Sequence, residues 1–249
     1  FFNYADRQAI FAVFPLLEKE LHLSSVQLGL LGSSFAITYG ICGVFAGAIV
    51  DRVRRVSAVL WGLYTWSIIC SATAISRTFP QLLAFRAAEG LGETVYYPAS
   101  MSLIGAYHGH ETRSRAMGLH QTSVYVGTIA GGFFAGLIGQ QDGWRWSFMV
   151  VGAAGILLGA VLQRYLKEPR AAKRVDERMP LRETFALLLG TPTVLCLLGA
   201  FLCANFVAVV LLSWMPSFLY QRFHRSLAMA GLSATLFSPG LISRGTARF

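Results

Sequence analysis

The chain has 249 residues, of which 55% are hydrophobic and only 13% are charged, and its formal net charge is +9. Soluble domains carry about a quarter charged residues, so this composition, with a mean hydropathy of +0.54, argues against a soluble enzyme, a nucleic-acid-binding protein and a disordered tail. In a membrane protein a positive balance arises from the Lys and Arg residues of cytoplasmic loops. The cysteines lie inside apolar runs without metal-ligand spacing, and we interpret all four as small core side chains: Cys42, Cys70, Cys196 and Cys203.

Long apolar stretches follow one another along the chain. A membrane-spanning helix needs about 20 largely apolar residues, whereas the strands of a membrane barrel are about ten residues long and alternate in polarity. The sequence therefore predicts an all-α, polytopic membrane helical bundle. In chain order, the eight candidate spans are residues 1–17, 26–50, 56–76, 79–107, 116–141, 146–163, 184–221 and 226–243.

Two features of these spans bear on helix packing. Small residues recur at or near a spacing of four at Gly43 and Gly47, and again at Gly127, Gly131 and Gly136, and such residues let helices approach closely in lipid. The run 184–221 is long enough for two short helices, but no turn cluster divides its middle. We expect one helix there, with a proline near each end.

The basic residues favour one set of loops. Alternate connections hold 12 Lys and Arg residues, and the other connections hold 5. The richer set, which includes the charged stretch 166–183, should face the cytoplasm together with the N-terminus. We therefore expect a six-helix unit at residues 1–165, a cytoplasmic linker at 166–183 and the start of a second unit at 184–249. A surface-lying amphipathic helix within the linker is an alternative.

The ends of the sequence suggest that both units are incomplete. The chain begins without Met, and its first apolar span is short of bilayer length. Its last ten residues turn polar where a helix should continue. A genuine C-terminal tail is the alternative to a truncated or frame-shifted product.

The loop after the second span carries a motif. Gly47, Asp51, Arg52 and Arg55 match the pattern G-x-x-x-D-R-x-G-R-R, which resembles the loop between helices 2 and 3 of the major facilitator superfamily; Arg54 stands where that family usually has Gly. The acid can pair with bases across the loop and act as a latch on one conformation of a rocking bundle. The alternative is an ordinary charged turn that only sets topology.

Further segments are similar to the same family. Residues 86–93 resemble the R-x-x-x-G-x-G-E segment of its helix 4, and residues 127–132 resemble its glycine-rich helix 5. Residues 3–7, 92–99 and 143–146 are similar both to the anion:cation symporter branch, which carries organic acids such as sugar acids, and to the Spinster-like branch, which exports lysolipids. The family has twelve helices in two halves, so the resemblance implies an N-terminal six-helix half plus helix 7 and part of helix 8.

Ionisable residues inside the spans are candidate functional groups, because charge is costly at bilayer depth. On a helical wheel, Arg86, Glu89, Glu93 and Tyr97 fall on one stripe. This stripe predicts a polar face that looks into the bundle or a wet cavity. The alternative is a self-satisfied charge cluster that only joins helices.

The first span adds a second pair of charges. Asp6 and Arg7 are neighbours in sequence and therefore point about 100° apart. We expect Asp6 to face Arg86, and Arg7 to face Glu93 or the cavity. The resemblance to the Spinster-like branch implies roles in coupling and substrate binding for the matching acids and arginine. The alternative places Asp6 and Arg7 near the membrane edge.

The charges of these five groups predict the mechanism. Three acids and two arginines leave a net charge of −1, so one acid should bind a proton. Glu93 is the first candidate for the proton carrier, followed by Asp6 and Glu89. Arg86 and Arg7 are the expected anion ligands, because a guanidinium binds a carboxylate through two parallel hydrogen bonds. Other cavity candidates are Tyr97, Gln121, Tyr125 and Asn205.

Together these observations predict a secondary active transporter that is proton-coupled and moves a small organic anion, a sugar acid or another carboxylate, by alternating access. A Spinster-like lysolipid transporter and a truncated, non-transporting remnant are the alternatives. The expected partners are the substrate, protons and the lipid bilayer, without nucleic acid, cofactor or metal, and the expected location is a bacterial inner membrane. An enzyme is disfavoured because the HExxH and GxSxG patterns are absent from the sequence. Antiport, uniport and the oligomeric state, monomer or otherwise, stay open.

Overall fold

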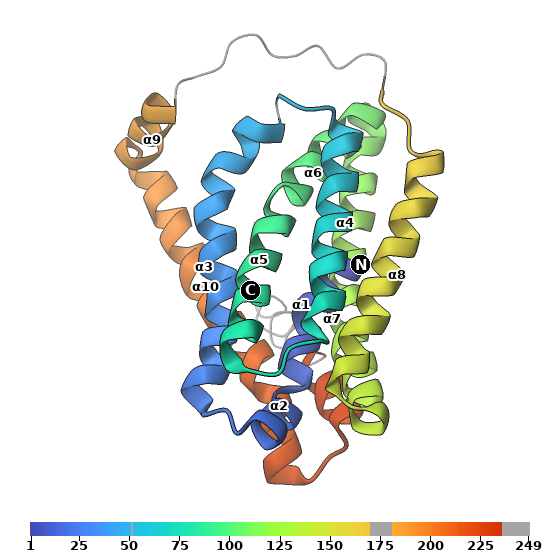
Figure 1. The fold of residues 1–249 in the computed structure, drawn as a ribbon. Helices are drawn as coiled ribbons and strands as arrows, with labels where there is room; N and C mark the ends of the chain where they lie inside the picture. The colour runs from blue at the N-terminus through green and yellow to red at the C-terminus, as the bar shows by residue number, and fades with distance from the viewer. Residues whose placement is uncertain (51, 170–180, 236–249) are drawn as a thin grey trace.

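A computed structural model describes residues 1–50, 52–169 and 181–235. Within these ranges the fold is a bundle of helices that run up and down, without strands (Figure 1). The predicted all-α helical bundle is therefore confirmed. The helices are α1 (Phe2–Ala12), α2 (Phe14–Leu21), α3 (Ser25–Val50), α4 (Arg55–Thr73), α5 (Phe79–Thr94), α6 (Tyr96–Tyr107), α7 (His110–Asp142), α8 (Trp144–Tyr165), α9 (Leu181–Gly190) and α10 (Pro192–Phe223).

Five of these helices are long and apolar enough to cross a membrane: α3, α4, α7, α8 and α10. The outward faces of the bundle are correspondingly apolar, and on α10 the side chains of Phe201, Leu202 and Phe206 are each more than two-thirds exposed. Such a surface would be unfavourable in water. It fits a bundle whose outer solvent is lipid.

Prolines divide two of the expected single spans. The first span is divided at Val13, two residues before Pro15, and the fourth is divided at Val95, three residues before Pro98. A proline has no N–H group to donate to the carbonyl one turn earlier, and its ring crowds that carbonyl. The expectation of one continuous helix over 79–107 was therefore wrong, although α5 and α6 follow each other with only one residue between them.

A third proline moves the start of the seventh span. Pro192 occupies the first position of α10, after the short helix α9, where its missing N–H costs nothing. The prediction of one helix from residue 184 onward is corrected to a long helix that begins at Pro192. Pro216 lies inside α10 without ending it. Residues 227–235 form a further helical stretch.

Only some of the small residues that were predicted to lie at close helix contacts do so. A side chain added at Gly127 or Gly131 of α7 would clash with the backbone of α1, and one added at Gly136 would clash with Leu227, which confirms these glycines as packing positions. Gly43 and Gly47 of α3 have no atom of another described element close to the place where a Cβ would lie. The prediction that this pair packs against another helix therefore does not hold among the described residues.

One end of the bundle collects the basic connections. The α3–α4 turn, the α6–α7 turn and the end of α8 all lie at the top of the view (Figure 1). There the Glu168 carboxylate accepts hydrogen bonds from the backbone N–H groups of Arg55 (3.1 Å) and Val56 (3.0 Å) at the start of α4. The Tyr107 hydroxyl donates to the carbonyl of Lys167. An acid at a helix N-terminus is favourable, so these bonds tie the segment after α8 to α4 and α6.

The opposite end carries a different cluster. Glu20, in the last turn of α2, accepts a hydrogen bond from Trp144 Nε1 at 2.8 Å and forms an ion pair with Arg145. Arg145 also donates to the carbonyl of Ser76 at 3.0 Å. These contacts join α2, the turn that follows α4 and the start of α8.

Candidate functional site

The candidate site lies where α1, α3, α4 and α5 meet. The charged stripe of α5 is buried: Arg86 is 1% exposed, and Glu89 and Glu93 are fully buried. Arg86 forms an ion pair with Glu89 one turn away. The wheel prediction of a stripe that looks into the bundle is confirmed for these three residues, whereas Tyr97, its fourth member, lies in α6 beyond the break at Val95 and is exposed.

The first helix brings its two charges to this stripe. Arg7 Nε donates to Glu93 Oε2 at 2.6 Å, so the predicted Arg7–Glu93 pairing is confirmed. Asp6 is 2% exposed, which places it inside the bundle and not at a membrane edge. However, Asp6 forms no ion pair with Arg86 among the described residues. Its Oδ1 instead accepts a hydrogen bond from the thiol of Cys70, at 2.9 Å.

Aromatic rings surround the two arginines. The Arg7 Cζ atom lies 4.9, 4.8 and 4.6 Å from the ring centroids of Tyr4, Phe35 and Tyr39. The Arg86 Cζ atom lies 5.1 Å from the centroid of the same Phe35 ring. Cations are attracted to aromatic faces at these distances. Phe35 therefore contacts both arginines.

A glycine allows Phe35 to reach this place. A Cβ atom on Gly90 of α5 would lie 2.6 Å from the carbonyl oxygen of Phe35 on α3, closer than real Cβ contacts. Only glycine permits α3 and α5 to approach each other so closely. In the sequence R-x-x-x-G, the arginine belongs to the charged stripe. The glycine allows the close packing that brings the Phe35 ring to Arg7 and Arg86.

The charge cluster is only partly satisfied. Within the described part of the chain, Asp6 Oδ2, Glu89 Oε1, Glu93 Oε1 and Arg86 Nε are buried without a hydrogen-bond partner. The hydrogen bonds of Arg7 in the same part use Nε alone, and its side chain stays 22% exposed. Buried polar atoms are normally paired. Each acid therefore keeps one oxygen for a proton, and the arginines keep donors for an anion.

A group of three side chains has the proximity that a metal site requires. Potential ligand atoms of Asp6, Cys70 and Glu89 all lie within 4.8 Å of one another. The Cys70 thiol still carries the hydrogen that it donates to Asp6, and Arg86 holds one oxygen of Glu89. Each of the three side chains therefore already has a hydrogen-bond or ion-pair partner inside the bundle.

The other predicted cavity residues stand outside this cluster. Tyr97 is 40% exposed, and its ring meets that of His120 edge-on at 6.1 Å. Gln121 and Tyr125 are exposed on α7. Asn205 is exposed on α10, where its amide donates to the carbonyl of Phe201 at 2.9 Å. Their substrate-binding role stays a prediction.

The predicted latch is only partly described. Asp51 lies outside the described residues. Gly47 and Arg52 are exposed, and Arg55 is half-buried at the first position of α4. The contact that the structure does give at this turn is the one between Glu168 and the backbone of Arg55 and Val56.

Sequence reasoning missed the uncharged side chains that contact the charged residues. Cys70 does lie in the apolar core, as predicted, but its thiol also donates to Asp6. Phe35 and Tyr39 were hidden in an uncharged span. A usable signal was their spacing of four residues, which puts both rings on one face of α3.

Comparisons with known proteins give the following similarities. The Major Facilitator Superfamily matches residues 1–248. The chain is 26% identical to a hexuronate transporter of Bacillus subtilis (strain 168), covering 96% of this chain and 58% of that protein. It is 26% identical to a probable L-galactonate transporter of Escherichia coli (strain K12), covering 94% of this chain and 55% of that protein.

Among solved structures, a bacterial homologue of the human lysosomal transporter Spinster, in an inward-facing and unoccupied conformation, is similar with a TM-score of 0.79 and 27% identity. That match covers 100% of this chain and 61% of the other. The chain therefore spans 55–61% of the length of these three proteins.

Proposed function

Since the chain belongs to the major facilitator superfamily, we propose that it serves in proton-coupled transport of a small organic anion across a membrane. The family consists of transporters and not of enzymes, and its members are multi-pass membrane proteins. Because the chain spans little more than half of its relatives, the proposal concerns the full-length protein that contains these helices.

One observation carries the proposal: five ionisable side chains meet inside the bundle, and their hydrogen bonds are incomplete. Asp6, Glu89 and Glu93 against Arg7 and Arg86 leave one net negative charge when all are ionised. A net charge in a low-dielectric interior is unfavourable. One bound proton brings the cluster to neutrality, and a second makes it positive.

The Arg7–Glu93 pair supplies the coupling step. While Glu93 is ionised, it competes with any incoming carboxylate for the Arg7 guanidinium, which it contacts at 2.6 Å. Protonation of Glu93 weakens that pair and releases the planar fork for the substrate. Proton binding and anion binding then favour each other, and the same coupling free energy links both events.

Arg86 provides the second part of an anion site. Its Nη1 is held by Glu89, whereas its buried Nε has no partner in the described part of the chain. The Phe35 ring contacts both guanidinium groups. Tyr97, Gln121, Tyr125 and Asn205 would extend this site toward the less charged parts of the substrate.

The substrate class follows from the relatives. The hexuronate and probable L-galactonate transporters carry sugar acids by name, and a carboxylate is the group that two arginines recognise best. We therefore propose a sugar acid or a related carboxylate. The likeness to the Spinster homologue favours an amphiphilic lysolipid as the second candidate.

The orientation is part of the same proposal. The basic end of the bundle, with the α3–α4 and α6–α7 turns and the end of α8, would face the cytoplasm of a bacterial inner membrane. The division into residues 1–165, a linker at 166–183 and a second unit from 184 follows the family's two halves.

The test is substrate-dependent proton uptake by the full-length protein in liposomes. Hexuronates and lysolipids would be compared at pH 5.5 and 7.5 with a pH-sensitive dye outside the vesicles. We expect hexuronate to drive proton uptake, and more strongly at the lower pH. Uptake of lysolipid alone would favour the second candidate, and hexuronate transport without proton movement would refute the coupling.

A further inference from the structure

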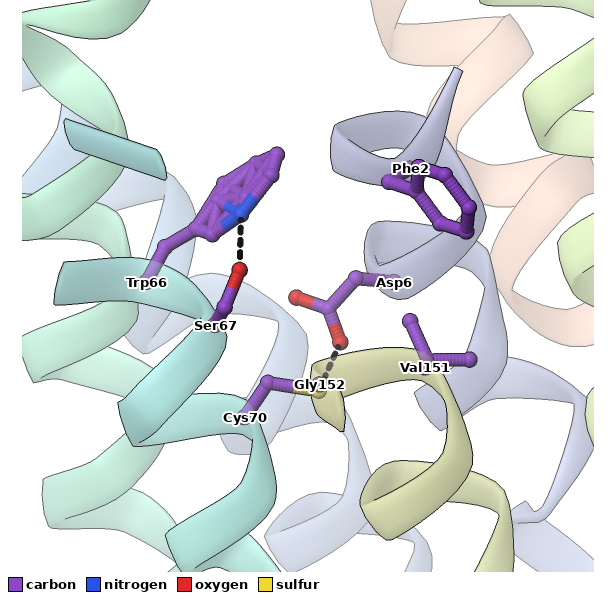
Figure 2. A pocket seen from close by; sticks show the side chains of 7 residues that line it. All are labelled: Phe2, Asp6, Trp66, Ser67, Cys70, Val151 and Gly152. Atoms are coloured by element: carbon purple, nitrogen blue, oxygen red, sulfur yellow. Dashed lines mark hydrogen bonds between the residues drawn. The ribbon is translucent and has the colours of Figure 1, made fainter. Parts of the chain in front are cut away.

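Asp6 of α1 accepts a hydrogen bond from a residue outside the charge cluster. Figure 2 shows Asp6 between α4 and α8, with the Cys70 thiol directed at Oδ1. The sulfur also lies 3.4 Å from the carbonyl oxygen of Phe148 on α8. A thiol carries one hydrogen, so it has two acceptors to choose from, and Asp6 at 2.9 Å is the nearer.

This arrangement selects one protonation state of Asp6. An ionised carboxylate accepts the thiol hydrogen and gains from it, because hydrogen bonds to charged groups are stronger than neutral ones. When Asp6 is protonated, the thiol can turn to the Phe148 carbonyl, so that neither state leaves the thiol without a partner. The preference for ionised Asp6 is therefore the difference between a thiol hydrogen bond to a charged acceptor and one to a neutral acceptor.

The second oxygen of Asp6 faces a narrow pocket. Asp6 Oδ2 has no partner among the described residues and points toward the Trp66 and Ser67 side of the pocket (Figure 2). Trp66 Nε1 donates to Ser67 Oγ at 3.1 Å. That bond uses the oxygen of Ser67 as an acceptor, and the serine hydroxyl makes no hydrogen bond to Asp6 in the described part of the chain.

Among the described residues, the charges in the remaining surroundings of Asp6 lie on α1 and α5. Arg7 is its neighbour on α1, and α5 contributes the stripe already described: Arg86, Glu89 and Glu93. The α7 helix meets α1 through Gly127 and Gly131. The α8 helix faces Asp6 with Val151 and Gly152, and α10 contacts α1 through its backbone at Leu212. Cys70 is thus the only titratable partner of Asp6 from α4 in the described part of the chain.

We propose that Cys70 is a positioning residue whose donated hydrogen keeps the transported proton off Asp6 and so directs it to the glutamates of α5, of which Glu93 holds Arg7. The inference rests on the proposed proton coupling and deepens it. Only a proton on Glu93 releases Arg7 for the substrate, because Arg7 contacts Glu93 and not Asp6. A proton held by Asp6 would neutralise the cluster equally well but would leave Arg7 occupied.

Removing the thiol should therefore separate proton binding from substrate binding. In Cys70→Ala, and in Cys70→Val, which restores the volume without a donor, we expect the midpoint of proton uptake by the purified full-length protein to move about one pH unit to the alkaline side. The gain in affinity for the probe D-glucuronate between pH 7.5 and 5.5 should fall at least threefold. Proton uptake would be followed with a pH indicator, and affinity by titration calorimetry.

Two variants control for a merely structural effect. Cys70→Ser keeps a donor and should retain the wild-type midpoint to within a few tenths of a pH unit. Cys42→Ala removes a half-buried cysteine of α3 and should change neither quantity. In the Glu93→Gln background, Cys70→Ala should no longer alter the affinity for D-glucuronate, because Arg7 is already released.

The possible results are separable. Wild-type values for both quantities in Cys70→Ala and Cys70→Val would overturn the inference and leave the proposed function intact. A Cys70→Ser protein that behaves like Cys70→Ala would also overturn it. A wild-type protein that takes up no proton and binds D-glucuronate equally at both pH values would refute the proposed coupling, and the inference with it.

Discussion

Two arginine–glutamate clusters occur among the residues that the structure describes, and they differ in how completely their atoms are paired. At the end opposite the basic turns, Glu20 uses both oxygens, one for Trp144 and one for Arg145, and its side chain is 46% exposed. In the interior, Glu89 and Glu93 each leave one oxygen without a partner in the described part, at no exposure. The exposed cluster is satisfied, and the buried one is not.

The difference shows what each cluster can do. Water can solvate the charges of the exposed cluster, so its contribution to stability is small, and its geometry serves to join α2 to α8. The buried cluster has no solvent to complete its hydrogen bonds. Its free energy therefore depends strongly on whether a proton or an anion is bound, which is the property a coupled transporter needs.

Removal of Arg86 should have the largest effect on the buried cluster. Without this charge the buried cluster goes from −1 to −2, and Glu89 loses its ion pair. We expect Arg86→Met to lower the free energy of unfolding by about 3–5 kcal/mol, the range for breaking a buried pair. Thermal unfolding in detergent measures the loss, and Arg86→Met combined with Glu89→Gln should recover most of it without recovering substrate binding.

A milder change at the same position tests the guanidinium itself. Arg86→Lys keeps the charge, but an ammonium cannot form two parallel hydrogen bonds to a carboxylate. We expect a near-normal unfolding temperature and a Kd for D-glucuronate more than tenfold higher, about 1.4 kcal/mol or more. An unchanged Kd would assign Arg86 to the packing of α5 alone.

Glu93→Gln neutralises the acid that holds Arg7 in the buried cluster. The variant cluster has no net charge when Asp6 and Glu89 are ionised, so it no longer requires a proton, and the amide mimics the protonated acid in size and hydrogen bonding. We expect proton-driven accumulation to be abolished, with slow, pH-independent exchange of substrate remaining.

The measurement for Glu93→Gln is accumulation against counterflow in liposomes over pH 5.5–7.5. Gln81, which accepts a hydrogen bond from the backbone of Arg77 outside the cluster, gives a control in Gln81→Ala, where accumulation should persist. An unaltered pH profile in Glu93→Gln would move the proton to Asp6 or Glu89.

The packing that builds the buried cluster can be tested at a glycine. A methyl group at Gly90 would meet the carbonyl of Phe35, whereas one at Gly43 meets nothing within 4 Å. Both residues lie in helices, so both gain similarly in helix propensity. We expect Gly90→Ala to lose about 1–3 kcal/mol of stability through overpacking and to weaken substrate binding, while Gly43→Ala is neutral or slightly stabilising. Equal effects of the two substitutions would refute the proposed close contact of α3 and α5.

The sequence predicted those features that depend on one helix at a time. Run length located the spans, and the 3.6-residue period placed Arg86, Glu89 and Glu93 on one face. The breaks at Val13 and Val95 were missed because the prolines that cause them lie inside apolar runs, which run length alone joins together.

The features that depend on two helices were predicted less well. Arg7 was correctly expected to face Glu93, since few partners of opposite charge exist in the spans. The partner of Asp6 was not found, because the rotation of α4 about its axis decides whether Cys70 or a neutral neighbour faces α1. The Glu168 cap joins residues more than 110 positions apart, and neither periodicity nor composition carries information about such a pairing.

The smallest effect is expected from a substitution in the exposed cluster. Glu20→Gln removes the charge that pairs with Arg145 but keeps an oxygen that can accept from Trp144 Nε1. Because Glu20 and Arg145 are 46% and 36% exposed, solvent screens the pair, and we expect a loss of less than 1 kcal/mol of stability that shrinks further in 1 M salt. Proton-coupled accumulation should keep its wild-type pH profile, as it should in the control Lys19→Gln, which removes an exposed charge from the same segment. If Glu20→Gln instead abolished accumulation while leaving the unfolding temperature unchanged, the satisfied cluster would also take part in transport, and incomplete pairing would no longer distinguish the functional charges from the structural ones.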